Sequence, residues 1–184
     1  MIIKRVSESN EITGIKKLQN ENLKSTLKES ERKEEGFVTA EYSVEFLEYM
    51  NAIEPSVIAK VENEIVGYAL VTTKEIKGKH LLLDDLFNEI DKLSYNNVLL
   101  SQINYVVVGQ LCVAKKFRGK GLAQKLYSFF KEELSHKYLY CLTDVDESNP
   151  RSIQAHLKSG FEIIGTLQYG GSCWHIVLWN WNKK

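Results

Sequence analysis

The sequence predicts a mixed α/β (α+β) fold, a central mixed sheet with helices on both faces, on the strength of three observations. The segment from Tyr105 to Val113 is apolar at almost every position, as in a central strand buried on both faces. The amphipathic segment from Leu122 to Leu134 separates it from a second apolar strand at 138–145, so a helix would join two parallel strands. Strand-like segments on either side of Gly170–Gly171 predict a final hairpin.

The residues before Tyr105 predict further strands and helices around this unit. In chain order these are a strand at 1–5, a helix at 7–24, a short helix at 43–51 and strands at 57–61 and 65–73 that join through a turn at Asn63–Glu64. Residues 26–36 are dense in charged and hydroxyl side chains, which is typical of a solvated helix end or a loop. Together with residues 36–42, this stretch is alternatively a cover for an active site.

The chain is expected to form a single domain over residues 1–184, with a helical insertion at about 74–103. Within the insertion, apolar side chains recur at helical spacing from Leu86 to Leu93, which predicts a helix lying over the sheet. Gly109 interrupts the central strand and predicts a bulge or a close approach of two backbones. Asn149–Pro150 predicts the start of a later helix, and Gly160 predicts its end.

Composition and charge narrow the class of protein. The 184 residues include 24 basic and 24 acidic side chains, so a surface that coats nucleic acid is not expected. No apolar run approaches the roughly 20 residues that span a membrane, and the first residues lack a signal-peptide layout. The three cysteines, Cys112, Cys141 and Cys173, favour a reducing compartment and lack zinc-ligand spacing. We therefore expect a cytoplasmic protein without a nucleic-acid, membrane or metal partner.

The loop from Val113 to Gly121, between the buried strand and the next helix, predicts an anion site. Its glycines let the backbone approach a ligand, and the helix start offers unpaired N–H groups and a partial positive charge. Lys115, Lys116, Arg118 and Lys120 add cations, so a pyrophosphate is the natural ligand. The pattern fits neither a Walker loop nor a dinucleotide fingerprint. The structural alternative is a plain strand–helix turn with solvated lysines.

Two blocks of the sequence resemble motifs of the GNAT acyltransferase superfamily. Residues 111–126 resemble its motif A, Q/R-x-x-G-x-G/A after a bulged strand, with both glycines matched and Lys116 in the place of Gln or Arg. That first position acts mainly through its backbone. Residues 149–161 resemble motif B, a helix that begins at an asparagine and ends in a Gly-Phe step. The resemblance covers about residues 104–181.

The resemblance implies a site for acetyl-CoA where the strands near 105–113 and 138–145 splay apart. The backbone of Leu111 and Val113 would pair with the pantetheine arm, and amides of the glycine loop would hold the pyrophosphate. The residues expected to bind the coenzyme are Leu111, Cys112, Val113, Arg118, Gly119, Lys120, Gly121, Leu122, Ala123, Asn149 and Ser152.

Acyl transfer to an amine needs a base for the amine, a hydrogen-bond donor for the oxyanion and an acid for the leaving thiolate. His156 is the candidate acid, since it stands where many members of the superfamily carry a tyrosine; alternatively it is a hydrogen-bonded histidine facing the sheet. Asp144, at the end of a strand, is the favoured base. A backbone N–H near Leu111 or Cys112 is the candidate oxyanion donor.

Other side chains near these positions have simpler interpretations. Gln110 lies near a strand position where some relatives carry Glu, but an amide cannot act as a base. His175 is an alternative base or an ordinary strand residue. Cys112 is expected to be a small buried hydrophobic residue rather than a nucleophile, which favours direct transfer. Three tryptophans are expected to close the core, with an acceptor pocket or a homodimer face as the alternative: Trp174, Trp179 and Trp181.

The sequence thus predicts an N-acyltransferase that moves acetyl from acetyl-CoA to a small amine or an amino-acid-like acceptor. A peptide or protein N-terminus is the alternative acceptor. Two other classes stay open at this point. One is a catalytically weak acyl-CoA-binding sensor, suggested by Gln110 and the missing tyrosine, and the other is a nucleotide-binding domain, suggested by the basic glycine loop alone.

Overall fold

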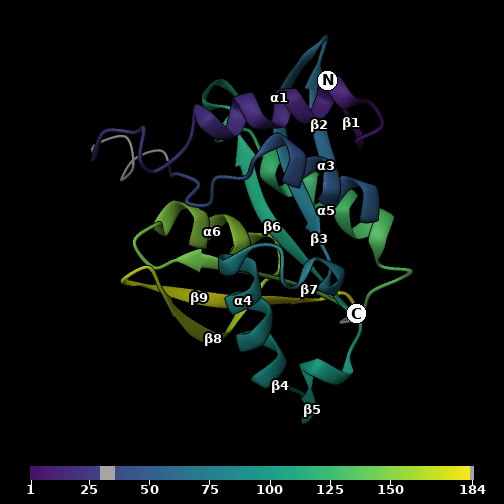
Figure 1. Ribbon diagram of the computed structural model, residues 1–184, viewed down its shortest axis with the longest axis vertical. Coiled ribbons are helices and arrows are strands. Elements are labelled where there is room, and N and C mark those ends of the chain that lie inside the picture. Colours follow the sequence, from purple (N-terminus) through teal and green to yellow (C-terminus); the bar gives the residue numbers. More distant parts are fainter. Residues whose placement is uncertain (30–35, 183–184) are drawn as a thin grey trace.

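The computed structural model describes residues 1–29 and 36–182, and its centre is a seven-stranded mixed sheet (Figure 1). The strand order across the sheet is β1-β2-β3-β6-β7-β9-β8. Neighbouring strands pair antiparallel except β6 and β7, which are parallel. The strands are β1 (Ile2–Arg5), β2 (Val57–Val61), β3 (Glu64–Thr72), β6 (Tyr105–Val113), β7 (Tyr140–Asp146), β8 (Glu162–Tyr169) and β9 (Ser172–Asn180).

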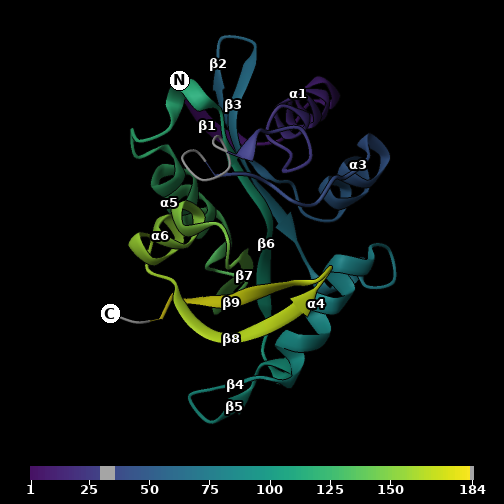
Figure 2. The ribbon, with the colours of Figure 1, turned by 90° about the vertical axis from the view of Figure 1, so that its left-hand side faces the viewer.

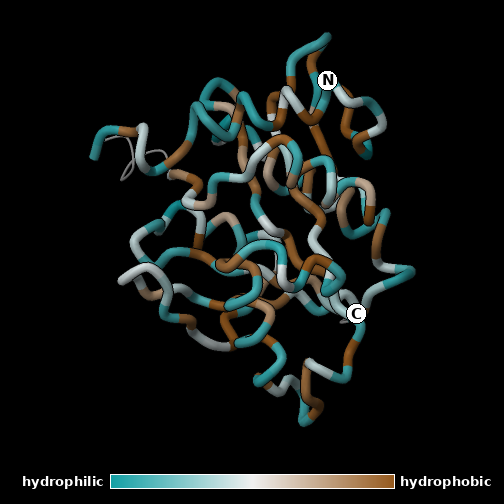
Figure 3. The backbone as a smooth tube through the Cα atoms, viewed as in Figure 1, coloured by the Kyte–Doolittle hydropathy of each residue, from teal (hydrophilic) through white to brown (hydrophobic). Residues whose placement is uncertain are grey.

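Helices cover both faces of this sheet, as predicted. They are α1 (Ser9–Asn20), α3 (Val44–Ile53), α4 (Leu81–Lys92), α5 (Leu122–Leu134) and α6 (Pro150–Lys158). Helices α1 and α3 lie on one side of β3 and β6, and α5 and α6 lie on the other (Figure 2). Two apolar clusters fill the layers, one under α1, α3 and α4 and one under α5. Hydrophobic segments accordingly run through the central strands (Figure 3).

The parallel strands β6 and β7 separate halfway along their length, as the resemblance implied. They pair only from Tyr105 opposite Tyr140 to Val107 opposite Leu142. The hydroxyl of Thr143 then donates to the carbonyl of Val108 at 2.7 Å. Beyond this point β6 keeps its partner β3 on one side, and its other edge opens toward α6.

The bulge predicted at Gly109 is confirmed. The register of β3 against β6 shifts between Leu70 and Val71, which leaves Gly109 as the extra residue. A Cβ atom at Gly109 would lie 2.3 Å from Oγ1 of Thr72, so only glycine fits between the two strands. The bulge stands at the point where β6 leaves β7.

Several predicted boundaries were wrong by a few residues, among them the end of the helix predicted at 43–51, which continues to Ile53. The first helix ends at Asn20 rather than at 24, since Leu23 turns away and forms a bridge with Val38. The turn after β2 is one residue earlier than predicted, with Glu62 at a φ of 53°. The strand predicted at 138–145 begins at Tyr140. Of the loop predicted at 26–36, residues 30–35 lie outside the described part.

The insertion at 74–103 contains the predicted helix, α4, and further elements that periodicity did not predict. Short 3-10 helices stand at Lys74–Ile76 and Leu100–Gln102, and a small hairpin joins β4 (Ser94–Tyr95) to β5 (Val98–Leu99). Asn96 and Asn97 both take positive φ, which is the conformation of a tight two-residue hairpin turn.

Candidate active site

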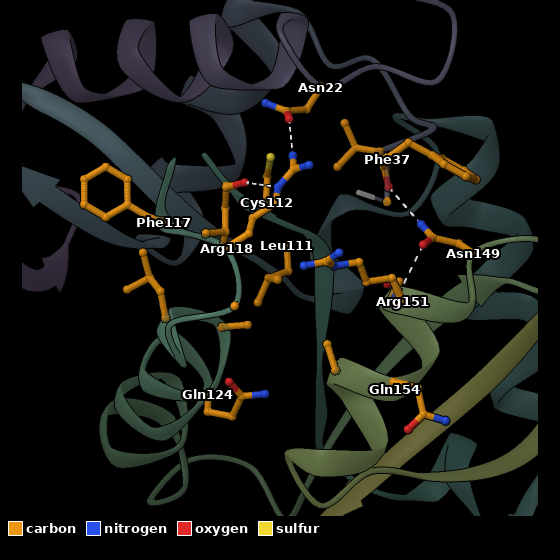
Figure 4. Close-up of a pocket in the computed structure, with 18 of the residues that line it drawn as sticks. Asn22, Phe37, Leu111, Cys112, Phe117, Arg118, Gln124, Asn149, Arg151 and Gln154 are labelled. Atoms are coloured by element: carbon orange, nitrogen blue, oxygen red, sulfur yellow. Dashed lines mark hydrogen bonds between the residues drawn. The ribbon is translucent and has the colours of Figure 1, made fainter. Parts of the chain in front are cut away.

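A cavity of about 550 Å³ opens where β6 and β7 separate. Its walls are the end of β6, the glycine loop that leads into α5, and one face of α6 (Figure 4). Asn22 and residues 36–38 close the remaining side. The volume is typical of a cleft that binds a small molecule or a cofactor.

The β6 wall presents free backbone groups to this cavity. The amide of Ala114 donates to the carbonyl of Val66 on β3. Because backbone groups of successive strand residues point to opposite sides, the N–H and C=O groups of Leu111 and Val113 face the cavity, while those of Cys112 face β3. The C=O of Val113 accepts from Nε of Arg118, which leaves both groups of Leu111 and the N–H of Val113 for a ligand. An extended ligand with amide groups can therefore add to β6 as a further strand would.

The glycine loop, which leads from β6 into α5, has the backbone geometry of an anion site. Gly119 and Gly121 take φ values of +71° and +75°, and Gly121 is the N-cap of α5. The amide of Lys125 donates to the carbonyl of Gly121, so the amides that precede it in the first turn have no carbonyl of the helix within reach. These N–H groups and the positive end of the helix dipole favour a phosphate.

Two arginines reach into the cavity from opposite walls, Arg118 from the glycine loop and Arg151 from α6 (Figure 4). The Nε atom of Arg118 donates to the carbonyl of Val113 at 2.8 Å, and its Nη2 atom donates to Oδ1 of Asn22. Arg118 therefore ties the glycine loop to β6 and to the end of α1.

Residues Gly36–Tyr42, which we call the strap, pass over this region. Val38 exchanges backbone hydrogen bonds with Asn22 and Lys24, and Nδ2 of Asn149 donates to the carbonyl of Phe37 at 3.1 Å. Asn149 also caps α6, because its Oδ1 accepts from the amide of Ser152 at 3.2 Å. The strap lines the large cavity, in keeping with the alternative interpretation of this stretch as a cover.

A second cavity, of about 70 Å³, adjoins the first and shares five residues with it: Phe37, Val38, Leu111, Asn149 and Ser152. Asp144 lies in its wall, with Leu82 and Trp174 nearby. The Oδ2 atom of Asp144 is buried and has no hydrogen-bond partner among the residues that the structure describes.

Two neighbouring carboxyl groups at this end of β7 differ in their pKa. Burial, with a smaller contribution from the negative charge of Asp146, outweighs a backbone hydrogen bond and raises the pKa of Asp144 to about 7. Burial also raises the pKa of Asp146, but hydrogen bonds from Lys24, at 2.8 Å, and from Ser148 outweigh it and hold this pKa below its usual value. Asp144 is therefore the carboxyl group suited to accept and release protons near neutral pH.

His156 lies in the same wall, but both of its ring nitrogens are engaged. The carbonyl of Ser152 can only accept, so Nδ1 carries the proton of that 2.7 Å hydrogen bond, and Nε2 accepts from the hydroxyl of Tyr127, also at 2.7 Å. Burial lowers the pKa of His156 to about 4, so the ring is neutral at pH 7. This geometry supports the alternative interpretation, a hydrogen-bonded core histidine, and the acid role stays a prediction without support from it.

The engaged ring of His156 predicts a pH-dependent stability. The unfolded chain binds a proton at His156 below about pH 6.5, whereas the folded chain does so only near pH 4. The stability that the neutral ring provides is therefore present above pH 6.5 and is lost as the pH falls toward 4, by about 3 kcal/mol in all. Urea unfolding from pH 4 to 7 should show a shallower dependence for His156→Phe than for the wild type. Equal slopes would contradict this assignment.

Most of the other candidate residues take the simpler of their interpretations, and Trp174 is the exception. Cys112 is buried, and burial raises the pKa of its thiol to about 12, so it is not a nucleophile at neutral pH. His175 pairs with Val145 within the sheet. Trp174 lines the small cavity, whereas Trp179 and Trp181 pack against each other in the apolar layer under α5.

The structure brings the predicted residues together in two adjoining places. Each residue expected to bind the coenzyme lines the large cavity except Lys120, whose Nζ atom lies 5.8 Å from the ring centre of Phe117. The two candidate catalytic residues, Asp144 and His156, line the small one. Sequence reasoning did not predict several residues of the large cavity: Asn22, Phe117, Gln124, Arg151, Gln154, Ala155 and Lys158.

The spacing of 151, 154, 155 and 158 along α6 places those residues on one helical face, so the predicted helix could have revealed them. No pattern in the sequence pointed to Asn22.

In the described part of the chain, no group of three or more His, Cys, Asp or Glu side chains could hold a metal ion. Within the same part, no helix has the length and apolar character needed to cross a membrane.

Comparison with known proteins gives one family. The model of the acetyltransferase (GNAT) family matches residues 20–161. A comparison with curated protein sequences gave no match.

Solved structures of acetyltransferases share the fold at low sequence identity. A GNAT-family acetyltransferase from Streptococcus agalactiae is 18% identical, with a TM-score of 0.68 over 100% of this chain and 96% of that one. The NatC complex bound to Gag peptide and CoA gives 14% identity and a TM-score of 0.65 over 97% of each chain. The yncA protein of Salmonella typhimurium, solved with its cofactor acetyl-CoA, is 14% identical in sequence. Its TM-score is 0.63 over 100% of this chain and 95% of that one.

Proposed function

Because the chain belongs to the GNAT acetyltransferase family, we propose that it transfers acetyl from acetyl-CoA directly to a primary amine of a small-molecule or amino-acid-like acceptor. The observation that carries this proposal is the arrangement of the two cavities. The large cavity has a free strand edge and an anion site, and the small cavity beside it contains the carboxyl group of Asp144. One site thus suits the donor and the adjoining site suits the amine.

The residues of the large cavity fit the donor. The C=O of Leu111 and the N–H of Val113 would hold the amide-containing pantetheine arm, and the amides from Gly119 to Ala123 would hold the pyrophosphate. The amide of Arg118 already donates to the carbonyl of Lys115 at 3.3 Å, so it is less available than the amides that follow. When bound, acetyl-CoA supplies an acetyl group activated as a thioester.

In the proposed reaction, Asp144 removes the proton that the attacking amine must lose. A carboxylate is a weak base in water, but a pKa of about 7 brings Asp144 close to the working pH, where general bases act best. The N–H group of Leu111 faces the cavity and is the proposed oxyanion donor, while that of Cys112 is turned toward β3. The amine nitrogen bonds to the acetyl carbon as the bond from that carbon to sulfur breaks, and coenzyme A leaves as the thiolate. We assign the proton that the thiolate takes up to solvent, because both nitrogens of His156 are engaged with Ser152 and Tyr127.

Binding of the donor can be tested before any acceptor is known. Acetyl-CoA at 100 times its dissociation constant is expected to stabilise the protein by about 2.7 kcal/mol, because it binds only the folded chain. Thermal unfolding should therefore show a rise in Tm of several degrees with acetyl-CoA and no comparable rise with ATP or NAD. A rise with ATP or NAD alone would favour the nucleotide-binding alternative.

Turnover on a panel of amines then identifies the acceptor class. Release of free thiol from acetyl-CoA would be followed with alaninamide, benzylamine and agmatine. Turnover with at least one of them is expected, whereas donor binding without turnover on any amine or peptide would favour the sensor alternative.

An N-terminal amine of a peptide or protein is the second candidate acceptor. It is supported by the NatC neighbour, whose structure contains a peptide together with CoA, although that likeness concerns the fold. Comparing alaninamide with the peptide Ala-Gly-Ser-Gly separates the two candidates, since both present the same α-amine. A kcat/KM at least tenfold higher for the peptide would favour the peptide acceptor.

A further inference from the structure

We propose that Gln110 is a positioning residue for the acceptor, which acts with Gln19 to hold the strap Gly36–Tyr42 as a wall of the small cavity. This inference rests on the proposed function, since it assigns the small cavity to the acceptor. Gln110 lies on β6 directly after the bulge at Gly109, and it lines the small cavity together with Thr39 and Ala40 of the strap.

The hydrogen bonds of Gln110 fix the orientation of its amide. The carbonyl of Ala40 can only accept, so Nε2 of Gln110 faces the strap, at 2.8 Å. Its Oε1 atom therefore faces the interior, where it accepts from Nε2 of Gln19 at 3.1 Å and from the hydroxyl of Tyr68 at 2.5 Å. Each polar atom of the Gln110 side chain is thus engaged.

Gln19 repeats this arrangement two residues further along the strap. The amide of Tyr42 can only donate, so Oε1 of Gln19 is the atom that accepts from it, at 3.0 Å. Two side-chain amides, one from β6 and one from α1, therefore bind the C=O of Ala40 and the N–H of Tyr42. They hold the strap as a neighbouring strand would.

Burial makes these contacts costly to lose. Gln19 is 0% exposed and Gln110 is 8% exposed, so water cannot readily replace a missing partner. The strap is also held at its other end, where Asn149 donates to the carbonyl of Phe37. Asn149 caps α6 beside the donor cavity, whereas Gln110 and Gln19 hold the end that faces the acceptor cavity. Loosening the end of the strap that Gln110 holds should therefore weaken the binding of the acceptor and leave the binding of acetyl-CoA nearly unchanged.

The most informative variant is Gln110→Glu, which keeps the size of the side chain. The carboxylate still accepts from Gln19 and Tyr68, but it has no N–H for the carbonyl of Ala40 and repels it. We expect the KM for the acceptor, measured with alaninamide and with Ala-Gly-Ser-Gly, to rise on the order of tenfold, and the KM for acetyl-CoA to change by less than about twofold. Gln102→Glu, the same change at an exposed position, should alter neither constant.

Hydrogen exchange of the Tyr42 amide gives a readout that needs no acceptor. Its protection should be lost in Gln110→Glu and retained in Gln102→Glu. Gln19→Met removes both the acceptor of the Tyr42 amide and the donor to Gln110, so it should have the same effects as Gln110→Glu, which keeps the test available if one of the two variants fails to fold. Retained protection, or equal rises in both KM values, would overturn the proposal. Absence of turnover in the wild type would instead count against the proposed function, and the exchange result would still decide the role of Gln110.

Discussion

Replacing Asp144 with Asn should lower kcat/KM by about 10²- to 10⁴-fold, the range expected when a general base is removed. The amide has nearly the same shape as the carboxyl group but cannot accept the proton of the amine. The binding of acetyl-CoA should stay within about twofold of the wild type, because Asp144 lies in the small cavity. Initial rates with the best acceptor and calorimetric binding of acetyl-CoA measure the two effects.

The pH profile identifies Asp144 more specifically than the loss of rate. As the pH falls through about 7, Asp144 becomes protonated in the folded protein and can no longer act as a base. The wild-type kcat/KM should therefore fall on the acid side with a midpoint near pH 7, and this limb should be absent from the residual activity of Asp144→Asn. Asp146→Asn is the matched control, because Lys24 and Ser148 keep the pKa of Asp146 low, and that variant should retain the limb. A limb that persists in Asp144→Asn would assign the base elsewhere.

The same substitution should stabilise the protein. The raised pKa means that folding opposes the ionisation of Asp144, so its contribution to stability is greatest below pH 4 and is lost as the pH rises through about 7. The shift from 3.8 to about 7 corresponds to at most about 4 kcal/mol. Asp144→Asn should accordingly raise the free energy of unfolding at pH 8 and leave it nearly unchanged at pH 3.5. A gain in stability together with a loss of activity is typical of a residue kept for function.

Gly121→Ala is expected to weaken the binding of acetyl-CoA by at least about tenfold. Gly121 takes a φ of +75°, which costs an L-residue roughly 1–2 kcal/mol. An added Cβ would meet no atom within 4 Å, so crowding inside the protein does not contribute. Strain would instead move the amides at the start of α5, on which the pyrophosphate is proposed to rest. Titration calorimetry measures the loss of affinity, and urea unfolding measures the strain.

Gly78→Ala provides the matched control for this loop. Gly78 has a φ of +82°, and a Cβ there would also meet no atom within 4 Å, but the residue lies in the insertion. Both variants should lose a similar free energy of unfolding, whereas only Gly121→Ala should lose affinity for acetyl-CoA. Equal affinities in the two variants would show that the glycine loop is not the pyrophosphate site.

The sequence by itself determined the parallel unit and the residues that form most of the large cavity. Three features depend only on residues close together in the chain: the apolar run of β6, the amphipathic pattern of α5 and the Asn149 cap. They can therefore be recognised from the sequence without knowledge of the fold. Gly109 predicted the bulge for the same reason, because a glycine interrupts the run of apolar side chains that is otherwise continuous in this strand. The glycine loop likewise carries its backbone conformation in its own residues.

Only the tertiary structure decided the geometry and the protonation states around the small cavity. The pKa of Asp144 depends on burial among segments far apart in the chain, and so does the neutral state of His156, which is buried against Tyr127, 29 positions away. The strap is held by Gln19 and Gln110, which are separated by 91 positions, and no local pattern links them. Periodicity and motifs report short-range geometry, whereas burial and hydrogen-bond partners arise from packing. The sequence therefore predicted the glycine loop from Lys116 to Gly121 as the coenzyme site, and the fold was needed to find the wall that we propose faces the acceptor.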